Sequence, residues 1–223
     1  MIGAWSAAGL GLVLLVIVLS VAIRLDAGPL AALRIVHRAA ASLEFVVMLV
    51  LAWLAWRRAL PVIALTLFLS VLGIAAGQNP PPAAATGNLL GGLALAAAFA
   101  WMLGRAHGRS AQPAGPIAHV AAALVAVQCA LGAWLAIFAK QLEPGALGAH
   151  TALGFALATG AVWLTLQPGR AARRLALLGI ALAAPAAGIA SAQFYQPLGA
   201  SLAHAAAAAL LVAAAAYAHA RLT

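Results

Sequence analysis

Four polar side chains occupy matching positions in an otherwise apolar chain, each 17 or 20 residues before an arginine. These residues are His37, Asn88, His150 and His204. His150 follows His37 by 113 residues, and His204 follows Asn88 by 116 residues. The nearly equal offsets predict two copies of one helical unit in the same orientation, residues 1–109 and 110–223.

Two histidines on facing helices can supply both axial ligands of a haem iron, and helix bundles hold cofactors in this way. Because a six-coordinate haem needs only two protein ligands, His150 and His204 predict one haem b in the C-terminal half. In the N-terminal half His37 would face Asn88, which is not a usual haem ligand. One haem is therefore better supported than two, with His37 a candidate ligand of a second. The alternative for each histidine is a hydrogen bond across helices or to a backbone carbonyl.

Three basic side chains are expected at the same depth in the membrane as the histidines. Arg24, Arg38 and Lys140 lie at helix ends on the histidine side of the chain, where they could bind haem propionates through charge-assisted hydrogen bonds. The alternative is that they are solvated loop charges or anchors whose charged ends reach the membrane surface.

Glu44 is the one carboxylate within an expected membrane span, and it lies seven residues after His37. Two helical turns separate the two residues, so both project from one helix face. Glu44 could act in catalysis by relaying protons, or it could be a neutral, hydrogen-bonded acid. Gln128 is expected to bridge helices, and Cys129 to be a small core residue.

The elements that position these residues follow from composition. The chain is 66% hydrophobic and 7% charged, whereas soluble domains average about 25% charged residues. Charge-free runs as long as 46 residues (59–104 and 175–220) can each hold two spans of roughly 20 residues. We therefore predict an all-α integral membrane protein with eight transmembrane helices, arranged as two parallel four-helix-bundle repeats. The expected helices are 4–24, 36–57, 60–77, 84–104, 116–138, 146–167, 173–191 and 197–220.

The distribution of arginine and lysine predicts the orientation. With the N-terminus inside, eight of the 12 basic residues fall at inner helix ends and four at outer ends. The positive-inside rule then predicts that the protein lies in a bacterial-type inner (plasma) membrane with both termini in the cytoplasm. The net charge of +9 is explained by topology and by attraction to the anionic lipid bilayer, so no nucleic-acid partner is expected.

Several short motifs resemble the haem A synthase family of eight-helix membrane proteins. The motifs are VLSVAIRLDAGP (18–29), IVHR (35–38), LGIAAGQNPPPAAATGN (72–88), VQCALGAWLA (127–136), GALGAH (145–150) and SLAH (201–204). The resemblance implies two four-helix halves, with haem b bound by the C-terminal histidine pair. It also implies that the N-terminal half frames the site where a methyl group of haem O is oxidised.

The chain departs from the family pattern in its N-terminal half. Arg34 stands where the family has a glutamate, and Asn88 stands where it has a histidine. Many members have a cysteine pair in the loop after their first helix, whereas Cys129 is the only cysteine in this chain. We therefore expect a degenerate N-terminal haem site beside an intact C-terminal one.

Three functional interpretations remain. The first is a haem A synthase-like b-type cytochrome, an electron-transfer or accessory subunit that works with other membrane redox subunits. The second is an enzyme, a divergent haem A synthase that oxidises the haem O methyl group. The third is a non-redox membrane accessory protein or transporter.

Overall fold

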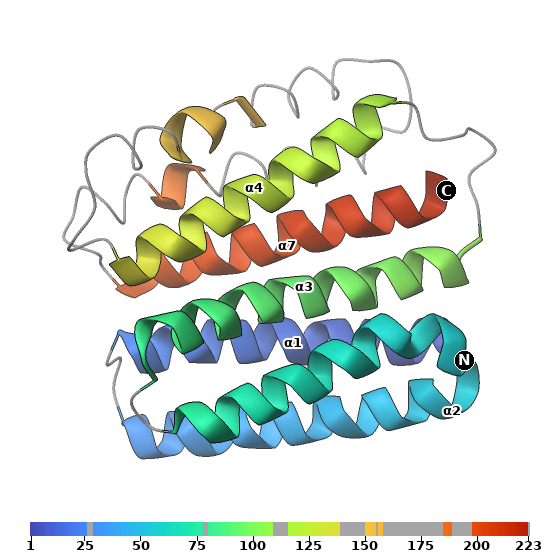
Figure 1. The fold of residues 1–223 in the computed structure, drawn as a ribbon, viewed down its shortest axis with the longest axis horizontal. Coiled ribbons are helices and arrows are strands. Elements are labelled where there is room, and N and C mark those ends of the chain that lie inside the picture. The colour runs from blue at the N-terminus through green and yellow to red at the C-terminus, as the bar shows by residue number, and fades with distance from the viewer. Residues whose placement is uncertain are drawn as a thin grey trace.

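The computed structural model describes residues 1–25, 29–77, 80–108, 116–138, 150–154, 156–157, 185–188 and 198–222. Its five long helices are α1 (Ile2–Arg24), α2 (Leu30–Ala76), α3 (Pro82–Ala106), α4 (Pro116–Phe138) and α7 (Leu198–Leu222). Residues 150–154, 156–157 and 185–188 are also helical. The predicted all-α fold is confirmed for the part of the chain that is described (Figure 1).

Helix α2 folds back on itself and is two helical arms joined by a sharp kink. Ala55 alone has non-helical backbone angles, with φ −157° and ψ 50°. The hydroxyl of Thr66 donates a hydrogen bond of 2.9 Å to Glu44, although a straight helix would separate these residues by about 33 Å. The two arms therefore lie side by side, as Figure 1 shows. They correspond to the expected helices 36–57 and 60–77, joined without the short loop predicted between them.

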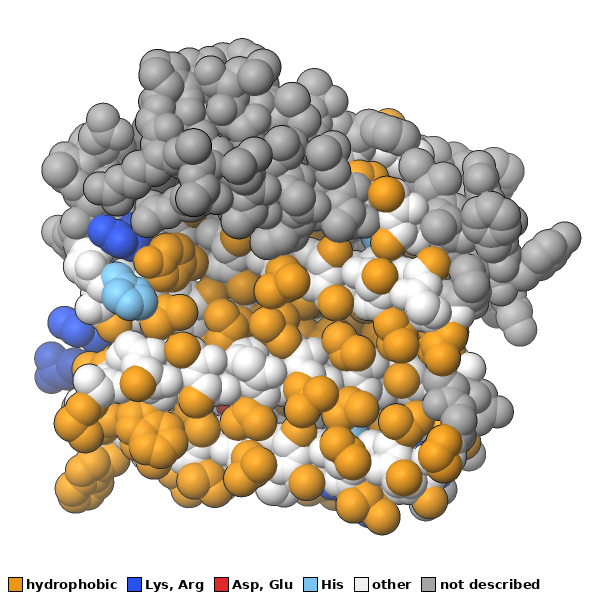
Figure 2. All heavy atoms as spheres, turned by 180° about the vertical axis from the view of Figure 1, so that it is seen from behind, with side chains coloured by type: hydrophobic (Ala, Val, Ile, Leu, Met, Phe, Trp, Pro, Cys, Tyr) orange, Lys and Arg blue, Asp and Glu red, His pale blue; other side chains and the backbone are white. Residues whose placement is uncertain are grey.

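Four of the described helices, α1, α2, α3 and α7, are long and apolar enough to cross a membrane. Large apolar side chains point outward, with Ile74 83% and Trp53 89% exposed. Figure 2 shows hydrophobic side chains over most of the described surface, with several arginine side chains at one end. These features indicate a membrane protein whose outer surface faces lipid.

The sequence-based helix boundaries agree closely with the observed ones for α1, α3, α4 and α7, whereas α2 begins at Leu30, six residues before the expected start at residue 36. The expected helix 116–138 coincides with α4, and α1, α3 and α7 each begin or end within two residues of the prediction. The expected helices 146–167 and 173–191 lie mostly outside the described residues. A total of eight spans in two repeated halves therefore stays a prediction.

Helix α3 connects the two parts of the bundle. It contacts α1 and α2 on one side and α4 and α7 on the other. Gly104 permits the close approach to α7, because a Cβ atom there would lie 2.6 Å from the Tyr217 carbonyl oxygen. On the other side the ring of Phe99, which is fully buried, packs against Gly9 of α1. Both chain termini lie at the same end of the helices (Figure 1).

Candidate functional site

The two histidines of the C-terminal half lie together. His150 is in the helical segment 150–154 and His204 is in the second turn of α7. Their ring centroids are 6.0 Å apart and the ring planes are nearly perpendicular, at 84°. Both side chains are half-buried. Residues 54 positions apart in the sequence thus face each other, as the repeat predicted.

A glycine lies against each of these imidazole rings. A Cβ atom added to Gly132 of α4 would lie 2.9 Å from Cε1 of His150. A Cβ atom added to Gly188, in the helical segment 185–188, would lie 3.0 Å from Nδ1 and Cε1 of His204. Any larger residue at either position would displace the ring. Four separate helical segments therefore contribute one histidine or one glycine each to this site.

Gln128 fixes the backbone next to His150. Its side-chain nitrogen donates a hydrogen bond of 3.0 Å to the His150 carbonyl oxygen. Gln128 lies on α4 one turn before Gly132, so one face of α4 holds both the backbone and the ring of His150. The expectation that Gln128 bridges helices is confirmed.

We tested whether this site fits a haem by its donor atoms and spacing. Nδ1 of His150 is buried and has no hydrogen-bond partner among the described residues, which is costly unless a ligand uses the ring. When two imidazoles bind the same metal ion from opposite sides, each at about 2 Å, their ring centroids lie about 6 Å apart. The observed 6.0 Å separation matches that requirement. The residue types and the ring separation therefore meet these two requirements of a bis-histidine haem site.

The corresponding histidine of the N-terminal half has a partner within the chain. Nε2 of His37, on the first arm of α2, lies 2.9 Å from the hydroxyl oxygen of Ser20 on α1. Ser20 precedes His37 by 17 residues and Gly132 precedes His150 by 18. In the predicted repeat, Ser20 of α1 therefore corresponds closely to Gly132 of α4.

Leucines of α2 pack against two glycines of α3 that are close to Asn88 in the sequence. Leu72 precedes Asn88 by 16 residues, the spacing that separates Gly188 from His204. A methyl carbon of Leu72 lies 3.1 Å from the Cβ position of Gly87, and Leu69 packs over Gly91 in the same way. The second arm of α2 thus packs against the part of α3 that carries Asn88. This packing is consistent with the degenerate N-terminal site expected from Arg34 and Asn88.

Glu44 is buried between the two arms of α2. It is 5% exposed and accepts the hydrogen bond from Thr66, which is 3% exposed. Both residues lie within the hydrophobic part of the bundle, next to Val47 and Met48 of the core. The observed contact shows Glu44 joining the arms of the hairpin, and a catalytic role for it is not tested.

The candidate propionate-binding cations are distributed differently from the histidine pair. Arg24 is exposed at the end of α1, one turn after Ser20, and therefore lies on the His37 side of that helix. Arg38 is exposed beside His37. Lys140 lies outside the described residues. Arg24 and Arg38 therefore belong to the N-terminal half, whereas His150 and His204 belong to the C-terminal half.

The remaining histidines lie near the opposite ends of the helices. The ring of His107 stacks edge-on against Tyr217 with centroids 5.9 Å apart, joining the ends of α3 and α7. His219 lines a groove beside α3, and the side chain of His119 is not among those described. In the described ranges no three His, Cys, Asp or Glu side chains come together, so a four-ligand zinc site is not formed there. Cys129 is a buried core residue, as expected.

Sequence reasoning did not identify Gly132 and Gly188. The chain contains 21 glycines, and composition does not distinguish one that faces a histidine from one that faces lipid. A signal was present in the spacing, because each glycine precedes its histidine by a similar distance, 18 and 16 residues.

In comparisons with known proteins, no protein-family model matches this sequence, and no curated protein matches it. A functional assignment therefore depends on the geometry described above and on the short motifs that resemble haem A synthases.

Proposed function

We propose that this protein is a haem A synthase-like membrane b-type cytochrome that binds one haem b through His150 and His204. The observation that carries the proposal is the pair of imidazole rings with centroids 6.0 Å apart, one of which has a buried nitrogen without a partner among the described residues. A bound haem would supply reversible one-electron transfer in an apolar surrounding. The protein would serve as an electron-transfer or accessory subunit of a membrane redox complex.

Each residue of the site has a defined task in this proposal. His150 and His204 hold the iron from two facing helices. Gly132 and Gly188 leave room for the two rings, and Gln128 holds the backbone of His150 in place. Lys140 is the proposed partner of the propionates of this haem, whereas Arg24 and Arg38 lie beside His37 and would serve only a second haem in the N-terminal half.

The proposal includes an orientation. Both termini would lie on the cytoplasmic side of a bacterial-type inner membrane, because the sequence predicts eight of the 12 basic residues at the helix ends on that side. The haem would then lie towards the outer side of the bilayer. Electrons would be exchanged there with partner subunits.

The second candidate function is a divergent haem A synthase. Glu44 favours it, because a buried carboxylate on the same helical arm as His37 is rare in a membrane span. A second haem would nevertheless require His37 to leave Ser20 and the leucines at positions 69 and 72 to move off α3. We therefore rank the cytochrome first.

Absorption spectroscopy of the purified protein tests the proposal. The protein, produced with ample haem supply, is expected to show the spectrum of a six-coordinate, low-spin b-type haem when oxidised and when reduced with dithionite. Analysis of the extracted haem is expected to yield haem b alone. Extraction of haem with an oxidised methyl group would favour the enzyme, and a colourless protein would overturn both candidates.

A further inference from the structure

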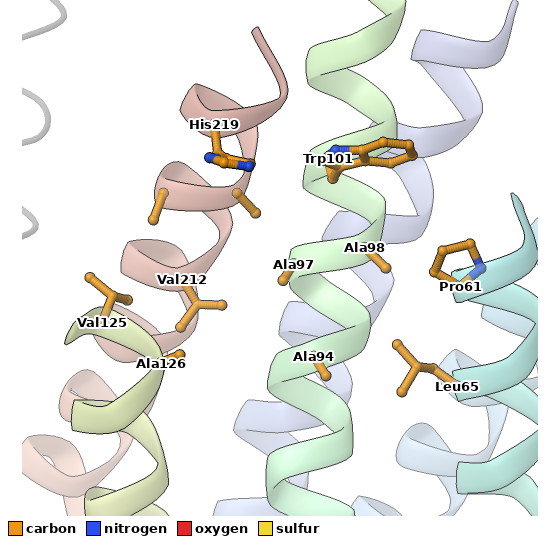
Figure 3. A pocket seen from close by; sticks show the side chains of 12 residues that line it. Pro61, Leu65, Ala94, Ala97, Ala98, Trp101, Val125, Ala126, Val212 and His219 are labelled. Atoms are coloured by element: carbon orange, nitrogen blue, oxygen red, sulfur yellow. The ribbon is translucent and has the colours of Figure 1, made fainter. Parts of the chain in front are cut away.

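An apolar groove crosses the junction of four helices. Its volume is about 440 Å³, within the range of about 300–1,000 Å³ common for ligand sites. Alanines of α3 form its floor, including Ala97 and Ala98 (Figure 3). The second arm of α2 forms one wall, and α4 with α7 forms the other. Within the described residues α2 contacts neither α4 nor α7, so α3 alone closes the groove between these walls.

The lining of the groove is hydrocarbon except at one end. Aliphatic side chains such as Leu65, Val125 and Val212 cover most of it, and none of the 12 lining residues is acidic. Trp101 and His219 lie together at the same end (Figure 3). Tryptophan is enriched where hydrocarbon meets the polar headgroups, so this end of the groove is expected at the membrane surface.

Arginines lie at the helix ends near this polar end. The guanidinium of Arg105 lies 5.9 Å from the centre of the Trp101 ring. Arg58 is exposed three residues before Pro61, a lining residue of α2, and so lies on the same face of its helix. Arg221 follows His219 by two residues at the end of α7. An apolar channel that ends at several cations is complementary to a molecule with a hydrocarbon chain and an anionic head.

We propose that this groove binds an anionic phospholipid of the surrounding leaflet. One acyl chain lies along the alanine floor of α3, and the phosphate lies among Arg105, Arg58 and His219. Guanidinium groups form paired hydrogen bonds with phosphate oxygens, and basic pockets between membrane helices recognise anionic headgroups. The bound lipid fills the space between the two parts of the bundle. This site is separate from the histidine pair and does not depend on the proposed haem.

Native mass spectrometry can test this proposal with the full-length protein. The protein is reconstituted in nanodiscs with equal amounts of phosphatidylglycerol and phosphatidylcholine and then released with its bound lipids. We expect the bound fraction to be enriched in phosphatidylglycerol. The double variant Arg58→Gln/Arg105→Gln should lose that enrichment severalfold, and Ala98→Phe should lower binding of both lipids by filling the groove.

Matched controls separate a defined site from general effects. Arg34→Gln removes a positive charge near the start of α2, at the opposite end of the first arm from the kink. Ala39→Phe adds a ring to an exposed position on the same arm. Both should bind lipid like the wild type. Equal binding of the two lipids by the wild type would overturn the proposal, as would an equal loss of phosphatidylglycerol with Arg34→Gln. If Ala98→Phe failed to give a helical, monodisperse protein, the arginine variants would still decide the result.

Discussion

At the scale of single residues, the two halves of the chain surround their histidines differently. His150 has a buried ring nitrogen without a partner among the described residues and a glycine against the ring. His37 has a serine hydroxyl 2.9 Å from its ring nitrogen. A buried polar atom without a partner is destabilising, so the C-terminal site is the one that would gain most from a ligand.

The buried pair formed by Thr66 and Glu44 predicts a measurable loss of stability. Thr66→Val removes the hydroxyl donor and leaves the side chain of Glu44 buried without that bond. We expect destabilisation of about 0.6–2 kcal/mol, the range seen for hydrogen bonds between membrane helices. Denaturant unfolding in mixed micelles, followed by circular dichroism, measures the change.

Glu44→Gln is the matched variant for this pair, because the amide oxygen can still accept the bond from Thr66. It should stay within a few tenths of a kcal/mol of the wild type, below the loss expected for Thr66→Val. Equal losses in the two variants would contradict the view that this hydrogen bond joins the arms of α2.

At the scale of helices, close approach to the histidines depends on Gly132 and Gly188. Gly132→Ala or Gly188→Ala would place a methyl group within about 3 Å of an imidazole ring. Each substitution should therefore lower the haem retained by the purified protein severalfold. The haem content per chain is measured as the pyridine haemochrome.

Gly73→Ala provides the control, because a Cβ atom there meets nothing within 4 Å. This variant should keep the haem content of the wild type. Full haem retention by Gly132→Ala and Gly188→Ala would show that neither glycine is needed for the site.

The helices themselves could be predicted from the sequence because charge-free runs mark the membrane spans. The predicted bounds of α4 agree with the observed ones, and those of α1, α3 and α7 differ by two residues at most. The reversal within α2 was predicted between residues 57 and 60, but its position at Ala55 without a loop could not be, since the residues around Ala55 are ordinary helix formers and the reversal is fixed by packing between the arms. The sequence repeat predicted that His150 and His204 face each other. The glycines that contact their rings could not be predicted, because that contact depends on how neighbouring helices pack.

At the scale of the whole molecule, the account makes a prediction about sidedness. The kink of α2 lies between Trp53 and Arg58, at the end where the sequence predicts most of the basic residues, whereas the start of α2 lies at the other end. In a Cys129→Ala background, Ala31→Cys should react with a membrane-impermeant maleimide in spheroplasts, and Arg58→Cys should react only after lysis. The reverse pattern would contradict the proposed orientation.

The central claim is that His150 and His204 together hold one haem b, and haem stoichiometry in histidine variants tests it most directly. Wild type, His150→Ala, His204→Ala and His37→Ala are purified in parallel, and the pyridine haemochrome is divided by the protein concentration. The account predicts one haem per chain in the wild type and in His37→Ala, and loss of that haem in both C-terminal variants. Full haem content in His150→Ala and His204→Ala, or loss only in His37→Ala, would contradict it.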